Sequence, residues 1–144
     1  MTKALLAIHV LAAIIAIGPV TVAASMFPAA ARRAAAEPDA GTGTLVVLHR
    51  ICQVYAVVAL AVPVFGLATA ANLHVLGSAW LIASIILTVL AAAVLALVML
   101  PGQARVLAAP APAARLAMAT GGFNLLWAAV TVLMIIRPGS TTGV

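Results

Sequence analysis

The chain consists of four long apolar runs separated by short polar stretches. The runs cover residues 4–27, 45–70, 79–100 and 116–136. A helix needs about 20 apolar residues to cross the hydrocarbon core of a bilayer, and each run is long enough. Within the runs the apolar residues are continuous and do not alternate with polar ones, which excludes the pattern of a membrane β-barrel. We therefore predict four membrane-spanning helices in a single membrane domain, residues 1–144.

The polar stretches between the runs are short, so successive helices are expected to lie antiparallel. They form a first loop at 29–43, a turn at 71–78 and a third loop at 103–115. Within the first loop, residues 31–36 are expected to continue as a short helix at the interface, before a turn at Pro38 and Asp39. Short connections of this kind favour an up-down arrangement. The predicted fold class is all-α, an integral membrane four-helix bundle.

Prolines mark both the ends and the interiors of the runs. Pro28 follows the first run and Pro101 follows the third, and we expect both to close their helices. Pro19 and Pro63 lie inside runs, where the missing N–H predicts a kink. The first run is longer than the apolar part of a secretory signal, so we expect a retained span. A short polar tail is expected at 140–144.

The composition supports lipid as the main solvent. Of the residues, 67% are hydrophobic and 6% are charged, whereas a soluble domain carries roughly 25% charged residues. The net charge of +5 does not indicate nucleic acid, because the seven basic residues are spread thinly along the chain. The single cysteine, Cys52, excludes an internal disulfide and is expected to be a small buried residue.

Basic residues predict the orientation. One side of the predicted membrane holds five basic residues, namely Arg32, Arg33, Arg50, Arg105 and Arg115. The other side holds two, Lys3 and Arg137. Loops rich in Lys and Arg stay in the cytoplasm. We predict a multi-pass protein of a bacterial plasma membrane, with loops one and three in the cytoplasm and both termini outside.

His9 is the most informative polar residue inside a run. On a helix it shares a face with Ala12, Ala13 and Ala16, a strip that permits close approach by a helix or a flat macrocycle. Imidazole is the usual axial ligand of a b-type haem. The alternative is a histidine that bonds across helices, or to a carbonyl freed near a kink.

The other histidines limit how a haem can be held. His9 is near the outer end of its span and His49 near the inner end of the next, about 15 Å apart in depth. The two therefore cannot ligate one iron. A bis-histidine site would pair His9 with His74, which is predicted near the same membrane face.

Two further groups of polar residues have open interpretations. His49 and Gln53 lie one turn apart and form a possible polar site for a quinone, a proton or a ligand; anchoring at the interface is the alternative. Asn124 and Trp127 form a stripe on the fourth run. This stripe is interpreted as helix packing or, alternatively, as a binding site.

The start and end of the chain resemble known families. The pattern Leu6–Leu11, with His9 inside it and Ile17-Gly18 after it, is similar to the first helix of small bacterial membrane proteins. These include the membrane domain of copper-resistance D proteins and an uncharacterised family of predicted integral membrane proteins. The ending at 133–140 resembles actinobacterial members of the latter family. The resemblance implies that His9 is a haem or metal ligand.

The chain lacks the residue sets of common enzymes, since it offers no paired carboxylates, no Ser/His/Asp set and no phosphate-binding glycine loop. We therefore favour a role other than catalysis. One hypothesis is the binding of haem or another small ligand through His9, in an accessory or electron-transfer role. The alternative is a non-catalytic subunit or assembly factor of a larger membrane complex, such as a respiratory one. A homo-oligomer is a further possibility.

Overall fold

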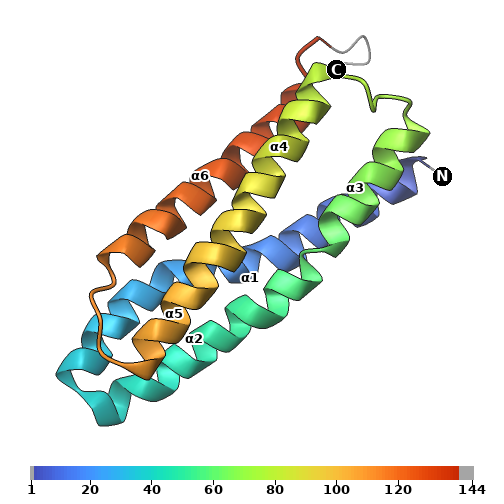
Figure 1. The fold of residues 1–144 in the computed structure, drawn as a ribbon. Helices are drawn as coiled ribbons and strands as arrows, with labels where there is room; N and C mark the ends of the chain where they lie inside the picture. Colours follow the sequence, from blue (N-terminus) through green and yellow to red (C-terminus); the bar gives the residue numbers. More distant parts are fainter. Residues whose placement is uncertain (1, 140–144) are drawn as a thin grey trace.

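The computed structural model describes residues 2–139, and they form a bundle of helices (Figure 1). In chain order the elements are α1 (Thr2–Ala36), α2 (Pro38–Val58), α3 (Ala61–Asn72), α4 (Ala79–Ala93), the π-helical segment η1 (Val94–Met99), α5 (Leu100–Ala108) and α6 (Ala114–Ile136). They make four rods, namely α1, α2 with α3, α4 through α5, and α6, each long and apolar enough to cross a membrane. The predicted all-α membrane bundle is confirmed, and the protein is a multi-pass membrane protein. The tail expected at 140–144 lies outside the described residues.

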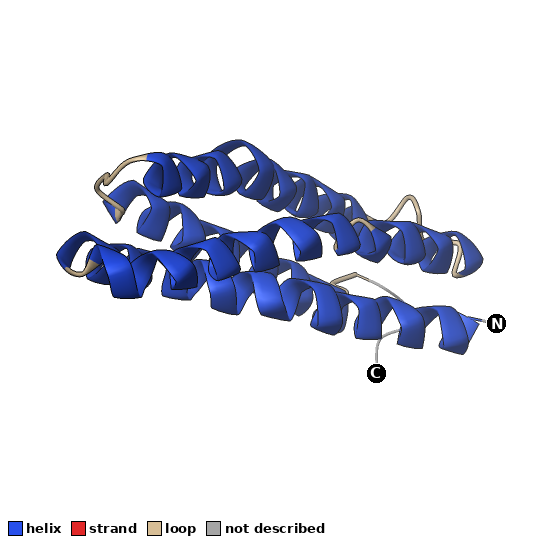
Figure 2. Cartoon of the chain, turned by 90° about the horizontal axis from the view of Figure 1, so that it is seen from below, coloured by secondary structure: helices blue, strands red, loops and turns tan. Residues whose placement is uncertain are grey.

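The rods are arranged as two hairpins. The first packs α1 along both α2 and α3, and the second packs α4 against α6. The hairpins meet where α1 contacts α6 and where α2 contacts α5. Figure 2 shows the rods running side by side along one direction. The start of α1, the end of α6 and the α3–α4 turn lie at one end of the bundle, and the α1–α2 and α5–α6 connections lie at the other (Figure 1). The arginines of this second end lie in the helices beside these connections.

Helix α1 continues through both of its prolines. Pro19 and Pro28 lie inside a single helix of 35 residues, which is about 52 Å long. The expected end at Pro28 is passed because the residues after it are alanines and arginines, which are strong helix formers. The helix stops before Pro38, since a proline disfavours helical dihedrals in the preceding residue, Glu37.

The α1–α2 connection is far tighter than the loop expected at 29–43. Only Glu37 separates the two helices. Pro38 occupies the first turn of α2, where its fixed φ suits a helix start, and Asp39 complements the dipole there. Gly41 lies directly against the backbone of Ala34, where a Cβ would overlap it. A close helical hairpin therefore replaces the predicted loop.

The second rod bends before Pro63, where the sequence predicts a kink. The helical ladder is interrupted at Ala59 and Leu60, and the N–H of Val62 bonds to the carbonyl of Ala59 at 3.0 Å. This bond reaches back three residues, which is the tighter 3₁₀ pattern that often marks a strained turn. The interruption separates α2 from α3.

The third rod continues past Pro101. The N–H of Leu100 bonds to the carbonyl of Leu95, five residues back, which is the π pattern of η1. Because Pro101 has no N–H, a shift of the bonding pattern just before it lets the helix run on to Ala108. The third loop consequently shrinks from the predicted 103–115 to residues 109–113.

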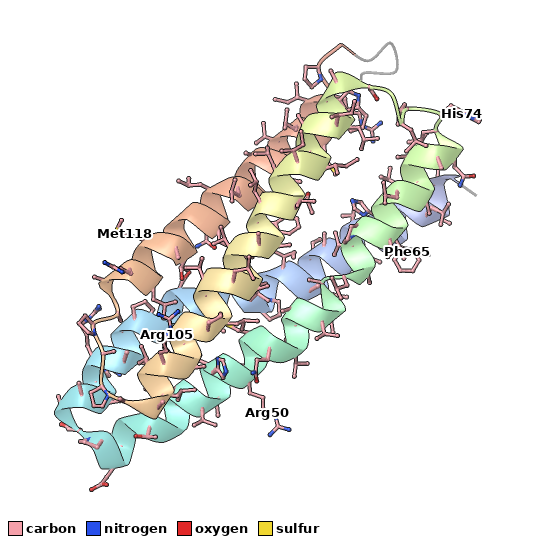
Figure 3. The ribbon with its side chains drawn as sticks, in the orientation of Figure 1. Arg50, Phe65, His74, Arg105 and Met118 are labelled. Carbon is pink, nitrogen blue, oxygen red and sulfur yellow. The ribbon has the colours of Figure 1, made fainter. Side chains whose placement is uncertain are left out.

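The main core lies between the middle of the bundle and its arginine-rich end. Its largest fully buried side chains include Phe27, Phe123, Met99 and Val20. A second, small cluster at the other end consists of Ala70, Trp80 and Leu81. Apolar side chains also cover the outside of the bundle, including Met118, which is 77% exposed and points away from the helices in Figure 3. This outer surface is suited to lipid.

Candidate functional site

His9 joins α1 to α3 through a hydrogen bond. Its ring is buried, and Nδ1 lies 2.9 Å from the carbonyl oxygen of Val62. A carbonyl only accepts, so Nδ1 carries the hydrogen and donates it. In the neutral form of the ring, this bond makes Nε2 the nitrogen with a free lone pair. The geometry is the cross-helix contact near a kink that the sequence offered as the alternative to haem ligation.

Gly66 makes room for the imidazole ring. It lies one turn after Val62 on the same face of α3. A Cβ at position 66 would lie 2.8 Å from Cε1 of His9 and 3.1 Å from Nδ1, which is closer than atoms pack. A side chain at position 66 would therefore require the ring to shift, and the hydrogen bond and the close contact together hold α1 against α3.

His74, the expected second ligand, lies elsewhere. It follows α3 in the turn to α4, is exposed, and has a left-handed φ of 55°. Figure 3 shows His74 at the end of the bundle. His9 contacts Val62 and Gly66 inside the first hairpin. The structure therefore places the two histidines in different surroundings.

A second polar cluster joins α2 to α5. His49 Nδ1 lies 2.9 Å from Oε1 of Gln103, and Nε2 of Gln103 donates to Cys52 Sγ at 3.5 Å. Gln103 and Cys52 are completely buried, whereas His49 is half-buried. Gln53, which the sequence grouped with His49, is exposed. The sequence reasoning missed Gln103 because it assigned this residue to a loop after Pro101; the available signal was its helical spacing of four from the buried Met99.

The stripe on α6 faces α1. Nδ2 of Asn124 donates to Oγ of Ser25 at 3.2 Å. Trp127 packs edge-on against Phe123, with ring centroids 6.2 Å apart. Among the described residues, Oδ1 of Asn124 and Nε1 of Trp127 are buried without a hydrogen-bond partner. The stripe thus contributes one polar contact between helices and two unpaired polar atoms.

Two grooves open on the surface of the bundle. The first, which we call the α6 groove, has a volume of about 450 Å³ and is lined by Val94, Val98, Ala119, Gly122, Leu125, Leu126 and Ala129. The second, which we call the Arg32 groove, has a volume of about 320 Å³ and is lined by Ala31, Arg32, Ala35 and residues 110–113. Neither groove is lined by His9, His74 or His49.

The buried hydroxyl groups are used within their own helices. Ser84, Thr120 and Thr69 each donate to the carbonyl four residues earlier, at 2.8, 2.9 and 2.7 Å. Within residues 2–139, no three His, Cys, Asp or Glu side chains lie close enough together to hold a metal ion. The polar side chains inside the described part of the bundle mainly satisfy the backbone and one another.

Comparison with known proteins adds no relative: no protein-family model, no curated protein and no solved structure matches the chain.

Proposed function

We propose that the protein is a non-catalytic subunit or assembly factor of a larger membrane complex, and that the α6 groove receives a transmembrane helix of its partner. The observation that carries this proposal is the groove itself. It runs between η1 and α6 and is lined almost entirely by apolar atoms. An apolar cleft with no directed polar group suits helix packing better than recognition of a polar small molecule.

The lining of the groove has the features of a membrane helix interface. Ala119, Gly122 and Ala129 are small and lie on one face of α6. Small residues let two backbones approach closely, which is the main source of helix association in lipid. A Cβ at Gly122 would meet nothing within 4 Å, so the space above this glycine is open to another chain.

The state of the buried polar groups supports a non-catalytic role. His9 and His49 each use Nδ1 in a bond between helices, and Gln103 uses both atoms of its amide. Catalytic groups need a substrate-accessible position and a partner that activates them. These residues instead stabilise the contacts between rods, so we assign the protein's function to its surface.

We further propose that the protein lies in a bacterial plasma membrane with the Arg32 groove and the α1–α2 hairpin in the cytoplasm. Both termini then lie outside. The support is the distribution of basic residues, five at the hairpin end against two at the other. Cysteine labelling from each side of the membrane, with single cysteines introduced at Asp39 and Leu76 in a Cys52→Ala background, tests this orientation.

The test of the partner helix uses two neighbouring glycines. Gly122 lines the α6 groove and Gly121 does not, yet both are exposed and both have open space above them. Gly122→Leu fills the groove, while Gly121→Leu adds the same side chain beside it. We expect Gly122→Leu to reduce stoichiometric co-purification of the partner from native membranes at least about fivefold, because overpacking costs about 1–3 kcal/mol. Gly121→Leu should retain the partner.

Two results would contradict the proposal. One is the same recovery of the partner with both variants, which would move the contact away from the groove. The other is a purified particle whose mass is a multiple of this chain alone, which would make the groove a contact between identical copies. The thermal midpoint of each variant, measured in the same detergent, separates loss of the partner from loss of the fold.

A second candidate function is ligation of haem or a metal through His9. It is favoured by the bond from Nδ1 to a backbone carbonyl, since metal-ligating histidines commonly fix their tautomer in this way and coordinate through Nε2. The surroundings fit a macrocycle poorly, because Gly66 already covers the ring and neither groove is lined by His9. An absorption spectrum of protein purified from its own host decides the matter. A Soret band that is lost in His9→Ala supports ligation, and a colourless full-length protein excludes haem.

A further inference from the structure

The Arg32 groove has different chemistry from the α6 groove. It lies between the last turns of α1 and the loop that leads into α6. Alanines and prolines form most of its walls, and Arg32 is its charged residue. The combination is a small apolar surface with a guanidinium at its edge.

The depth of the groove follows from α6. This helix has 23 residues, about 35 Å at 1.5 Å per residue, which is close to the thickness of the hydrocarbon core. The groove is lined by Ala113, directly before the first residue of α6. It therefore lies at the level of the lipid head groups. The tip of the α1–α2 hairpin extends beyond this level, because α1 continues four residues past Arg32.

Positive charge at this end of the bundle exceeds negative charge. All five arginines here are exposed, and the only carboxylate side chains in the sequence are Glu37 and Asp39. At least three of the guanidinium groups therefore have no carboxylate of this chain to match them. Arg115 adds to the excess at the groove, since it follows Ala113 by two residues and the first turn of α6 contains no acidic residue.

We propose that the Arg32 groove binds the head group of an anionic phospholipid. The guanidinium of Arg32 contacts the phosphate, and Arg115 contributes positive charge nearby. Arginine suits this task because its planar donors match phosphate oxygens. The alanines and prolines accommodate the glycerol and the upper part of an acyl chain. A zwitterionic head group fits less well, because its ammonium group would meet the uncompensated arginines.

The positive charge of the groove favours an anionic lipid over a zwitterionic one. Its position at the level of the head groups favours a membrane lipid over an anion dissolved in the aqueous phase. Basic pockets between membrane helices are known to hold anionic head groups, and each basic residue near the surface strengthens such binding. The proposal is independent of the partner helix, since the two grooves share no lining residue.

The test is native mass spectrometry of the full chain in detergent, with phosphatidylglycerol or phosphatidylcholine of identical acyl chains added. We expect the wild-type protein to retain phosphatidylglycerol preferentially, and Arg32→Gln to weaken this retention about fivefold. Arg50→Gln is the matched control. Arg50 is also exposed but lies on α2, where Figure 3 shows its side chain pointing away from the bundle. This control should retain the lipid as the wild-type protein does.

Three results would overturn the proposal. Equal retention of the two lipids would show that charge does not select the ligand. Equal losses in Arg32→Gln and Arg50→Gln would show diffuse attraction with no site at the groove. Displacement of bound phosphatidylglycerol by millimolar inorganic phosphate would assign the groove to a free anion. Because both substitutions are at exposed positions, an unchanged melting temperature is expected for each and confirms that the fold is intact.

Discussion

His9 and His49 hold the first hairpin's α2–α3 rod at two different depths, and they do so in contrasting ways. His9 donates to a backbone carbonyl, that of Val62, at 2.9 Å. His49 meets a side-chain amide, that of Gln103, at the same distance. The first contact lies within one hairpin, whereas the second joins the two hairpins. Positions 49 and 62 are 13 residues apart on this rod, or about 20 Å along a helix.

The difference follows from where each histidine lies relative to the main core. Around His49 the main core surrounds Gln103 and Cys52, so both amide atoms of a buried glutamine need partners, and both have one. His9 and Val62 are buried but lie outside both apolar clusters, and the ring of His9 packs directly against Gly66. We conclude that the half-buried His49 joins a polar network that reaches into the main core, while the buried ring of His9 is itself a packing element.

Substitutions at the contact between His9 and Gly66 are expected to cause the largest loss of stability. Gly66→Ala places a Cβ 2.8 Å from the ring, and we expect it to lower the free energy of unfolding by about 1–3 kcal/mol. Gly18→Ala is the control, because a Cβ there meets nothing within 4 Å. It should leave stability unchanged or raise it by up to about 1 kcal/mol through helix propensity. Reversible unfolding in mixed micelles, followed by circular dichroism, measures both.

A double variant identifies the cause. Replacing His9 by alanine in the Gly66→Ala background removes the ring that the new methyl group would strike. The double variant should therefore lose less stability than the sum of the two single variants. Additive losses would mean that the ring does not pack against Gly66.

The next largest loss of stability is expected from disrupting the network of His49, Gln103 and Cys52. Gln103→Leu keeps the approximate volume but leaves Nδ1 of His49 without its acceptor, and we expect a loss of about 1–2 kcal/mol in the same unfolding assay. Gln53→Leu is the control, because Gln53 is exposed. If the two substitutions cost the same, the buried amide would contribute nothing beyond an exposed one, and the contrast between the histidines would fail.

The smallest loss of stability is expected from a substitution at Arg137, where α6 ends beside α4. Cζ of Arg137 lies 5.6 Å from the centroid of the Trp80 ring, and the cluster around Trp80 is small. Arg137→Gln should lower stability by about 0.5–1 kcal/mol, as expected for a cation–π contact near the surface. Arg33→Gln, at an exposed position in the last turn of α1, should cost less. A shift in the fluorescence of the Trp80 ring, measured in a Trp127→Phe background, reports on the contact directly.

The four membrane spans were predictable from the sequence, because the length of an apolar run is enough to identify a span. Several helix ends were not predictable. Pro28 and Pro101 are ordinary stop signals, but the helix continues past both. It continues into alanine-rich sequence after Pro28, and it reaches Pro101 through the π pattern of η1. The π pattern of η1 accommodates the missing N–H of Pro101, but the presence of a proline does not indicate whether a helix will shift its bonding pattern in this way or end. The interruption before Pro63 coincides with the kink predicted there.

The candidate sites were predictable to a smaller extent. His9 was identifiable because a polar group inside an apolar run needs a partner, but which partner it has depends on the pairing of α1 with α3. Gln103 was assigned to a loop, so its contact with His49 was not foreseen. The α6 groove arises from η1 and α6 together, two segments that meet only in the folded bundle.

Photo-cross-linking in native membranes tests the central claim most directly. Ala129 lines the α6 groove and Ala128 does not, although both are exposed on the same helix. A benzoyl-phenylalanine placed at 129 should cross-link to one membrane protein in a defined product, and the same probe at 128 should give little of it. Equal yields from the two positions, or a product at 129 formed only with lipid, would contradict a partner helix in the groove.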